Sequence, residues 1–159
     1  KNTFSVIFDV QPELYEYCIV KLVLQPILEN AINYGVREMD DCGEIKVTGR
    51  MQGENIILSV TDNGLGMTEE EVDLILTDSK RIRKHGSGVG LVNVNNRIQI
   101  LFGKEYGLVV ESEPDEGTTV SICIPAVLYT EDNREDLEKG RMFRKEETAK
   151  EVQVKRDDE

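Results

Sequence analysis

The chain has 159 residues, about the length of one domain, of which 39% are hydrophobic and 31% are charged. No apolar segment approaches the roughly 18 residues that a membrane-spanning helix needs. The 31 acidic and 19 basic residues give a formal charge of -12, which excludes the broad cationic surface that duplex DNA or anionic lipid requires. We therefore expect no nucleic acid partner and no direct membrane contact.

Cysteine usage and the first residues suggest a compartment and a context. The three cysteines are far apart, no C-x-x-C pair is present, and the single histidine cannot complete a metal site with them. This pattern favours a reduced, cytoplasmic protein. Because the chain begins at Lys1 without a Met or a signal peptide, we expect it to be part of a longer protein.

The composition changes near Pro125. Residues 131–159 contain 11 acidic and 8 basic residues and few large apolar ones, which is typical of a solvated segment. A helix around Arg134–Val152, interrupted at Gly140, is compatible with this composition. The sequence thus predicts one folded domain over residues 1–127 and a charged C-terminal tail over residues 128–159.

In chain order, the first predicted elements are a strand, a long helix and a hairpin. Thr3–Val10 has a strand pattern, and residues from about Ile19 to Val36 have helical periodicity, with Pro26 in the first turns, where a missing N–H is tolerated. Glu44–Gln52 and Asn55–Asp62 alternate apolar and polar residues around a glycine, which predicts a β-hairpin.

The second half of the domain predicts two helices and a second pair of strands. Thr68 and Glu71 have the spacing of a capping box, so a helix should begin directly after Thr68. Apolar residues recur at helical spacing over Leu91–Phe102, and the glycine that follows is typical of a helix C-terminus. The closing strands are expected at Leu108–Ser112 and Thr118–Pro125. Helices on one face of a mixed sheet give an α+β fold, a two-layer α/β sandwich.

The long helix carries the first of three polar clusters. Its 3.6-residue period places Glu29, Asn30 and Asn33 within an arc of about 100°, opposite an apolar face. A solvated helix face is one explanation. Paired asparagines are unusual on such a face because their side chains compete with the backbone for hydrogen bonds, so a binding role is the other.

The second cluster is Asp62-Asn63-Gly64-Leu65-Gly66-Met67, between an apolar strand and the capped helix. These residue types are common in turns, which is sufficient to explain the cluster by itself. Two glycines also let a ligand approach the backbone closely, and the Asp62 carboxylate is a suitable acceptor for an exocyclic amine.

The third cluster is Gly86-Ser87-Gly88-Val89-Gly90-Leu91, which leads into the next predicted helix. Free N–H groups at a helix start bind anions, and glycines let phosphate oxygens come close. The Lys-Ser/Thr pair of a Walker A loop is missing, and no strand precedes the glycines as in a Rossmann fingerprint. A basic segment precedes them instead and is either near phosphates or solvated: Lys80, Arg81, Arg83 and Lys84.

The order of these clusters resembles that of the GHKL ATPases. Gln25–Gly35 resembles the N box, residues 62–67 the G1 box and residues 86–91 the G2 box, while Gly117-Thr118-Thr119 resembles the start of the closing strand. Within that family, the Leu-Gln-Pro-x-x-Glu-Asn-Ala and Gly-Leu-x-Asn-Val-x-x-Arg segments resemble the catalytic ATP-binding (HATPase_c) domains of LytS/YesM-like sensor histidine kinases. The resemblance implies the Bergerat ATP-binding fold, with ATP and Mg²⁺ as cofactors.

The resemblance also implies roles for individual residues. Asn30 matches the Mg²⁺ ligand, and Glu29 matches the acidic residue beside it, which is a base in hydrolysing relatives and an orienting group in kinases. Asp62 matches the residue that reads the adenine amino group, and Thr118 matches a hydroxyl near the adenine-bound water. The other matched nucleotide-binding positions are Asn33, Tyr34, Gly64, Gly66, Met67, Gly86, Ser87, Gly88, Val89, Gly90 and Leu91.

Two departures from the wider family accompany these matches. Asn33 stands where a basic residue that touches phosphate is often found. The Phe-rich F box is missing between Glu70 and Lys84, as in LytS/YesM-like domains, which implies a short lid over the nucleotide.

The implied function is that of the ATP-binding catalytic domain of a two-component sensor histidine kinase. Such a domain donates the γ-phosphate to a histidine on a separate dimerisation domain, and a response regulator acts downstream. His85 lies in the expected lid, so we expect the acceptor histidine elsewhere in the parent protein, with the parent anchored in the bacterial cell membrane and this domain in the cytoplasm. The domain alone should then bind Mg-ATP and do little chemistry.

Two other functions agree with the same sequence. One is a protein-serine kinase of the anti-sigma-factor type, with Glu29 as the base for a serine hydroxyl. The other is a non-enzymatic domain in which nucleotide binding changes a docking surface.

Overall fold

The computed structural model describes residues 4–37, 39, 42–77 and 88–139. The chain divides into two compact units, Lys1–Leu128 and Tyr129–Glu159. Within the described ranges, no helix is both long enough and apolar enough to cross a membrane.

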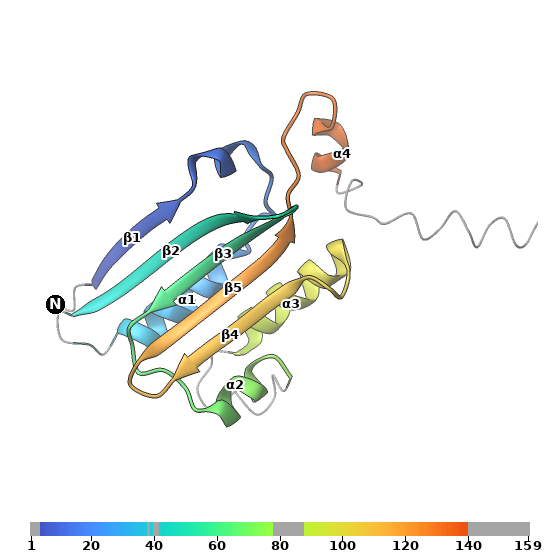
Figure 1. Cartoon of the computed structure of the whole chain (residues 1–159). Helices are drawn as coiled ribbons and strands as arrows, with labels where there is room; N and C mark the ends of the chain where they lie inside the picture. The colour runs from blue at the N-terminus through green and yellow to red at the C-terminus, as the bar shows by residue number, and fades with distance from the viewer. Residues whose placement is uncertain (1–3, 38, 40–41, 78–87, 140–159) are drawn as a thin grey trace, which may run out of the picture. The chain divides into compact units, whose positions relative to one another are not determined.

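A five-stranded mixed sheet forms one layer of the first unit (Figure 1), with the strand order β1-β2-β3-β5-β4. Strand β1 runs parallel to β2, and the other neighbouring pairs are antiparallel. The strands are β1 (Phe4–Val10), β2 (Gly43–Gln52), β3 (Asn55–Asp62), β4 (Gly107–Glu113) and β5 (Gly117–Pro125).

Helices form the second layer behind the sheet in Figure 1. They are α1 (Leu24–Asn30), which continues as the π-helical segment η2 (Ala31–Val36), α2 (Glu69–Ile75) and α3 (Gly88–Phe102); a short 3-10 helix, η1 (Pro12–Glu16), follows β1. Alternate residues of the central strands are buried against this layer, among them Ile45 and Val47 of β2 and Leu58 and Val60 of β3. This arrangement confirms the predicted α+β two-layer sandwich.

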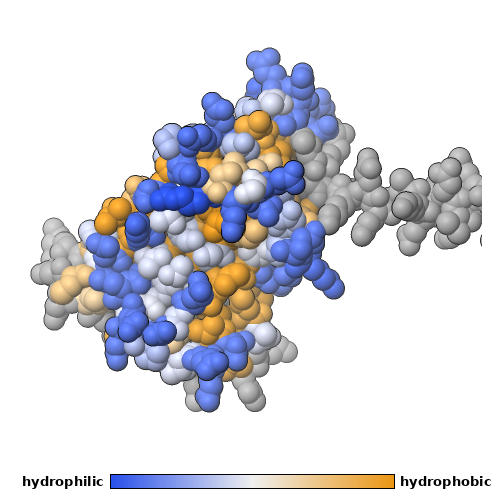
Figure 2. Space-filling view, viewed as in Figure 1, coloured by the Kyte–Doolittle hydropathy of each residue, from blue (hydrophilic) through white to orange (hydrophobic). Residues whose placement is uncertain are grey.

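The other face of the sheet is not covered by the described helices of this unit. In Figure 2, which shows this face, hydrophilic residues are spread over the surface with hydrophobic ones between them. An ion pair on β1 and β2 joins Asp9 Oδ2 to Arg50 Nη2 at 2.5 Å. The hydrogen bond from Arg50 is the largest cause that lowers the pKa of Asp9 below its ordinary value.

Local sequence signals gave correct turns and helix ends. Gly53, in the β2–β3 turn, has φ +60°, which glycine adopts at no steric cost. Thr68 caps α2 through a complete capping box with Glu71. Gly103 follows α3 with φ +109°, and its N–H donates to Gln99 O at 2.9 Å.

The predicted start of the long helix was wrong. Regular helix begins at Leu24 rather than near Ile19. Leu22 has φ +63°, a left-handed conformation that cannot belong to a right-handed helix. The N–H of Cys18 donates to Val127 O at 2.7 Å, which ties the preceding segment to the chain after β5. Tertiary contacts thus override the apolar periodicity of residues 19–23.

The predicted polar face of this helix was also wrong in part. Asn30 is buried, whereas Asn33, expected beside it, is exposed. The reason is the π-helical segment, in which i→i+5 hydrogen bonds bring residues five apart to the same side. The buried pairs Asn30 with Gly35 and Ala31 with Val36 follow that spacing.

In the second unit, the described part of the predicted tail helix is α4 (Arg134–Glu138). Arg134 Nε pairs with Glu138 Oε1 at 2.9 Å, and Lys139 pairs with Glu135, both four residues apart. The predicted continuation beyond Gly140 lies outside the described residues.

Candidate nucleotide-binding site

Three polar side chains stand side by side on the helix-facing side of the sheet, where β3 ends. Asp62 pairs in register with Thr118 of β5, and Thr118 pairs with Ser112 of β4. Asp62 is only 4% exposed and Thr118 only 7%. Buried polar groups at the end of a sheet need partners, so this row is a candidate for ligand recognition.

Ser112 links this row to the loop that follows β3. Its Oγ accepts a hydrogen bond from the Met67 N–H at 2.8 Å and donates to Gly117 O at 2.8 Å. Because a serine hydroxyl has one proton, the 2.8 Å contact between Ser112 Oγ and Thr118 Oγ1 then has Thr118 as its donor. Thr118 Oγ1 therefore keeps its lone pairs for an incoming donor.

Ser112 was not among the site residues predicted from the sequence. The alternation of β4 could have identified it. Leu108 and Val110 lie on the helix-facing side, and Ser112, two residues after Val110, lies on the same side. A serine at that position breaks the apolar pattern at the same level of the sheet as Asp62 and Thr118.

Backbone amides hold the Asp62 carboxylate. Its Oδ1 accepts from the Gly64 N–H at 3.0 Å. Burial raises the pKa of Asp62 above the ordinary aspartate value, and hydrogen bonds from the backbone of Gly64 and Thr118 oppose that rise. The carboxylate thus lies in a low-dielectric environment, where a further donor would be bound strongly.

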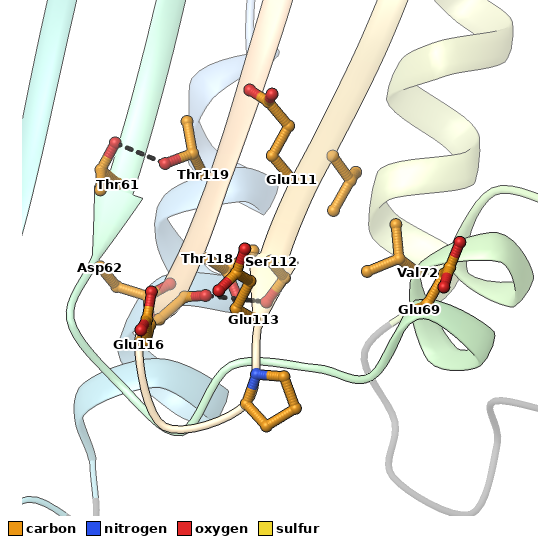
Figure 3. Close-up of a pocket in the computed structure, with 13 residues that line it drawn as sticks. Thr61, Asp62, Glu69, Val72, Glu111, Ser112, Glu113, Glu116, Thr118 and Thr119 are labelled. Atoms are coloured by element: carbon orange, nitrogen blue, oxygen red, sulfur yellow. Dashed lines mark hydrogen bonds between the residues drawn. The ribbon is translucent and has the colours of Figure 1, made fainter.

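A cavity of about 620 Å³ opens at this end of the sheet, beside α2 and strands β4 and β5 (Figure 3). Of the predicted site residues, Asp62 and Thr118 line it. Four carboxylates also line it: Glu69, Glu111, Glu113 and Glu116. These carboxylates make the lining acidic, and an acidic lining repels a polyphosphate.

Asn30, at the end of α1, has an unsatisfied amide. The residue is 9% exposed, and its Oδ1 is a buried oxygen with no hydrogen-bond partner among the described residues. A buried acceptor without a partner is unfavourable, so this oxygen is suited to accept from or coordinate an incoming group. An amide oxygen is a ligand type that Mg²⁺ accepts together with phosphate oxygens, and Asn30 therefore fits a magnesium role.

The start of α3 lies against α1. A Cβ atom at Gly90 would lie 3.3 Å from Pro26 Cβ, and Arg97 Nη1 donates to Lys21 O at 3.0 Å. The first turn of a helix has N–H groups without intrahelical partners, and in α3 this turn, residues 88–91, lies close to α1. The helix begins at Gly88 rather than Leu91, which places Gly88, Val89 and Gly90 inside that first turn.

The glycines after β3 are required by contacts within the protein. A side chain at Gly64 would overlap the backbone of Gly35, and one at Gly66 would overlap the Glu113 carbonyl. Gly66 also has φ +65°. The close approach that the sequence predicted for a ligand is therefore made here by the chain itself.

The other predicted site residues differ in burial. Glu29 is exposed, and its Oε1 accepts from Gln25 Nε2 at 2.8 Å. Asn33, Tyr34 and Val89 are exposed, Met67 is half-buried, and Leu91 is fully buried in the core. Gly86 and Ser87 lie outside the described residues.

The family of histidine kinase-, DNA gyrase B- and HSP90-like ATPases matches residues 19–128. The chain belongs to this family. Residues 19–128 contain every element described above except β1, η1 and α4.

Several relatives within this ATPase family are sensor histidine kinases. The chain is 34% identical to the sensor histidine kinase YesM of Bacillus subtilis over 118 residues, which are 74% of this chain and 19% of YesM. It is 32% identical to the sensor protein LytS of Bacillus anthracis over 127 residues, 78% of this chain and 21% of LytS. A third relative, the uncharacterized protein YwpD of Bacillus subtilis, is 38% identical over 77% of this chain and 42% of its own length. The chain thus spans less than half of each of these relatives.

Solved structures agree on the fold. The catalytic domain of histidine kinase ThkA aligns with a TM-score of 0.60 at 20% identity, covering 78% of this chain and 80% of that domain. The mycobacterial sensor histidine kinase MprB aligns with a TM-score of 0.56 at 18% identity, covering 79% and 84%. The chain therefore has the α+β fold of histidine kinase catalytic domains.

Proposed function

We propose that this domain binds Mg-ATP between the Asp62–Thr118–Ser112 row and the facing ends of α1 and α3, and serves as the catalytic domain of a sensor histidine kinase. The observation that carries the proposal is the buried Asn30 Oδ1, which lacks a partner among the described residues. Family membership supports the nucleotide, and the sensor-kinase relatives support the reaction.

Each part of the site has a separate task in this proposal. Asp62 accepts from the amino group of adenine, with Thr118 as an acceptor beside it. The N–H groups at the start of α3 hold phosphate oxygens. Asn30 would hold Mg²⁺, which supplies charge neutralisation on the phosphates when bound. Gln25 Nε2 donates to the exposed Glu29 carboxylate, and from this surface position Glu29 would orient the attacking group.

The phosphate acceptor in this proposal is a histidine on another domain of the same parent protein. A response regulator takes the phosphate next, and the parent is anchored in the bacterial membrane with this domain in the cytoplasm. Phosphoryl transfer depends on placing the nucleophile in line with the γ-phosphate, so the domain by itself binds nucleotide without transferring phosphate.

The magnesium assignment is tested with Asn30→Ala. Titration calorimetry should show Mg-ATP affinity lowered by at least about tenfold, while ATP affinity without metal changes much less, because only the metal ligand is lost. Asn96→Ala, which removes an exposed amide from α3, is the matched control and should bind as the unmodified domain does. Equal losses with and without Mg²⁺ would show that Asn30 is not a metal ligand.

A further inference from the structure

Gly35 lies within a helical segment, where glycine stabilises the backbone less than other residues do. It belongs to the π-helical segment η2 and has no positive φ, so its conformation is open to any residue. Glycine within a helix is less favourable than alanine because it loses more conformational freedom on folding. A tertiary contact must therefore explain the glycine.

That contact is with the carboxylate of Asp62. A Cβ atom on residue 35 would lie 2.5 Å from Asp62 Cγ, 2.6 Å from Oδ1 and 2.9 Å from Oδ2. All three separations are shorter than non-bonded heavy atoms tolerate. The carboxylate thus occupies the space that any side chain at residue 35 would need.

Asp62 has little freedom to move away from such a side chain. Its backbone is paired on both sides, with Ile45 of β2 and Thr118 of β5. The Gly64 N–H holds its Oδ1 at 3.0 Å, and the loop at Gly64 itself lies against the backbone of Gly35. A methyl group at residue 35 would turn the carboxylate out of its present position.

We propose that Gly35 is a positioning residue that fixes the direction of the Asp62 carboxylate and thereby the recognition of the nucleotide base. This inference rests on the proposed function, because it takes Asp62 as the group that binds the base. Gly35 touches no nucleotide and acts through Asp62 alone.

The test is a double-mutant cycle with Gly35→Ala, Asp62→Ala and the double variant, measured as Mg-ATP affinity. Gly35→Ala should weaken binding about 10- to 100-fold, the range for one misplaced buried hydrogen-bonding group. In the Asp62→Ala background the same change should alter affinity less than about twofold, because the carboxylate that it displaces is gone. A purely structural role for Gly35 would give equal losses in both backgrounds, and that result would overturn the inference.

If Gly35→Ala folds poorly, thermal unfolding of the nucleotide-free proteins tests the same contact without a binding measurement. The melting temperature should fall for Gly35→Ala, whereas adding Gly35→Ala to Asp62→Ala should leave it unchanged or raise it. A double variant that melts below Asp62→Ala would contradict the proposed contact. Gly49→Ala is the matched control, since its Cβ would press on Leu14 and Val10, 3.0 Å away, and its effect should be the same in both backgrounds.

The two hypotheses fail in different ways. If the unmodified domain does not bind Mg-ATP, the proposed function is wrong. If it binds and Gly35→Ala binds equally well, the proposed function stands and the role of Gly35 is wrong.

Discussion

At the scale of single residues, the ionised Asp62 carboxylate lowers the stability of the fold, and the proposed function also gives it a binding role. Its pKa is raised in the folded chain, so the folded state holds the proton more tightly than the unfolded state does. The protonated Asp62 side chain therefore stabilises the fold fully below the ordinary aspartate pKa. This stabilisation is lost as the pH rises through the raised pKa of Asp62 in the folded state. At neutral pH, the ionised carboxylate destabilises the nucleotide-free fold.

Asp62→Asn should separate these two effects. Without nucleotide, the variant should melt at a higher temperature than the unmodified domain at about pH 7.5, and this difference should shrink as the pH falls to the ordinary aspartate pKa of about 3.9 and below it. ATP affinity should fall by about 2 to 4 kcal/mol, because the adenine amine loses its charged acceptor. A lower melting temperature at neutral pH would contradict the burial argument, and GTP binding as tightly as ATP would contradict the assignment of Asp62 to adenine.

Glu29 and Asn30 are neighbours with different surroundings, and this predicts different phenotypes. Glu29 is exposed and hydrogen-bonded to Gln25, so Glu29→Gln should leave Mg-ATP affinity within about 1 kcal/mol. Autophosphorylation of a longer form that contains the acceptor histidine should slow by about 10² to 10⁴ fold if Glu29 assists transfer. An unchanged rate would show that Glu29 has no role in phosphoryl transfer and is a surface residue that supports α1.

At the scale of elements, Ser112 joins the loop after β3 to the β4–β5 turn. Ser112→Ala leaves the Met67 N–H and the Gly117 carbonyl without this partner, so urea unfolding should show a loss of about 1 to 3 kcal/mol. Ser121→Ala is the control, because its hydroxyl pairs with Ser59 Oγ across β3 and β5 away from the site. The loss of unfolding free energy in Ser121→Ala should stay within about 1 kcal/mol. Equal losses for the two variants would show that the Ser112 hydrogen bonds contribute no more than an ordinary cross-strand pair.

Elements with local chemical signals were predictable from the sequence. The hairpin follows from strict alternation around Gly53, and α2 follows from Thr68 and Glu71, because each signal acts within a few residues. The π-helical segment was not predictable from a 3.6-residue period, and this is why Asn30 was placed on the same face as Asn33. Nor did the sequence reveal Leu22 with its positive φ or the contact between Gly35 and Asp62, since these depend on packing between distant segments.

Among the site residues, those marked by a local pattern were predictable from the sequence, whereas one that depends on strand pairing was not. Asp62 stood out because a carboxylate ends an apolar strand. Ser112 became recognisable only when the pairing of β4 with β5 placed it beside Thr118. The glycines were recognised as special, but the structure gives protein contacts as the reason at Gly64 and Gly66.

At the scale of the whole molecule, the proposed function gives this domain the nucleotide site and places the acceptor outside it. The purified chain incubated with γ-labelled ATP should therefore incorporate no label, although it binds nucleotide. Joining it to the acceptor-histidine domain of its parent should restore labelling. Stable labelling of the isolated chain, retained in a His85→Ala variant, would point to a serine kinase or to another acceptor within the domain.

The central claim is that this chain binds Mg-ATP through Asn30 and Asp62. Titration calorimetry of the purified domain with ATP, in matched buffers with and without Mg²⁺, tests it most directly. We expect saturable binding with one site per chain, tighter with Mg²⁺ than without it. No binding at millimolar ATP, or binding that ignores Mg²⁺ altogether, would contradict it.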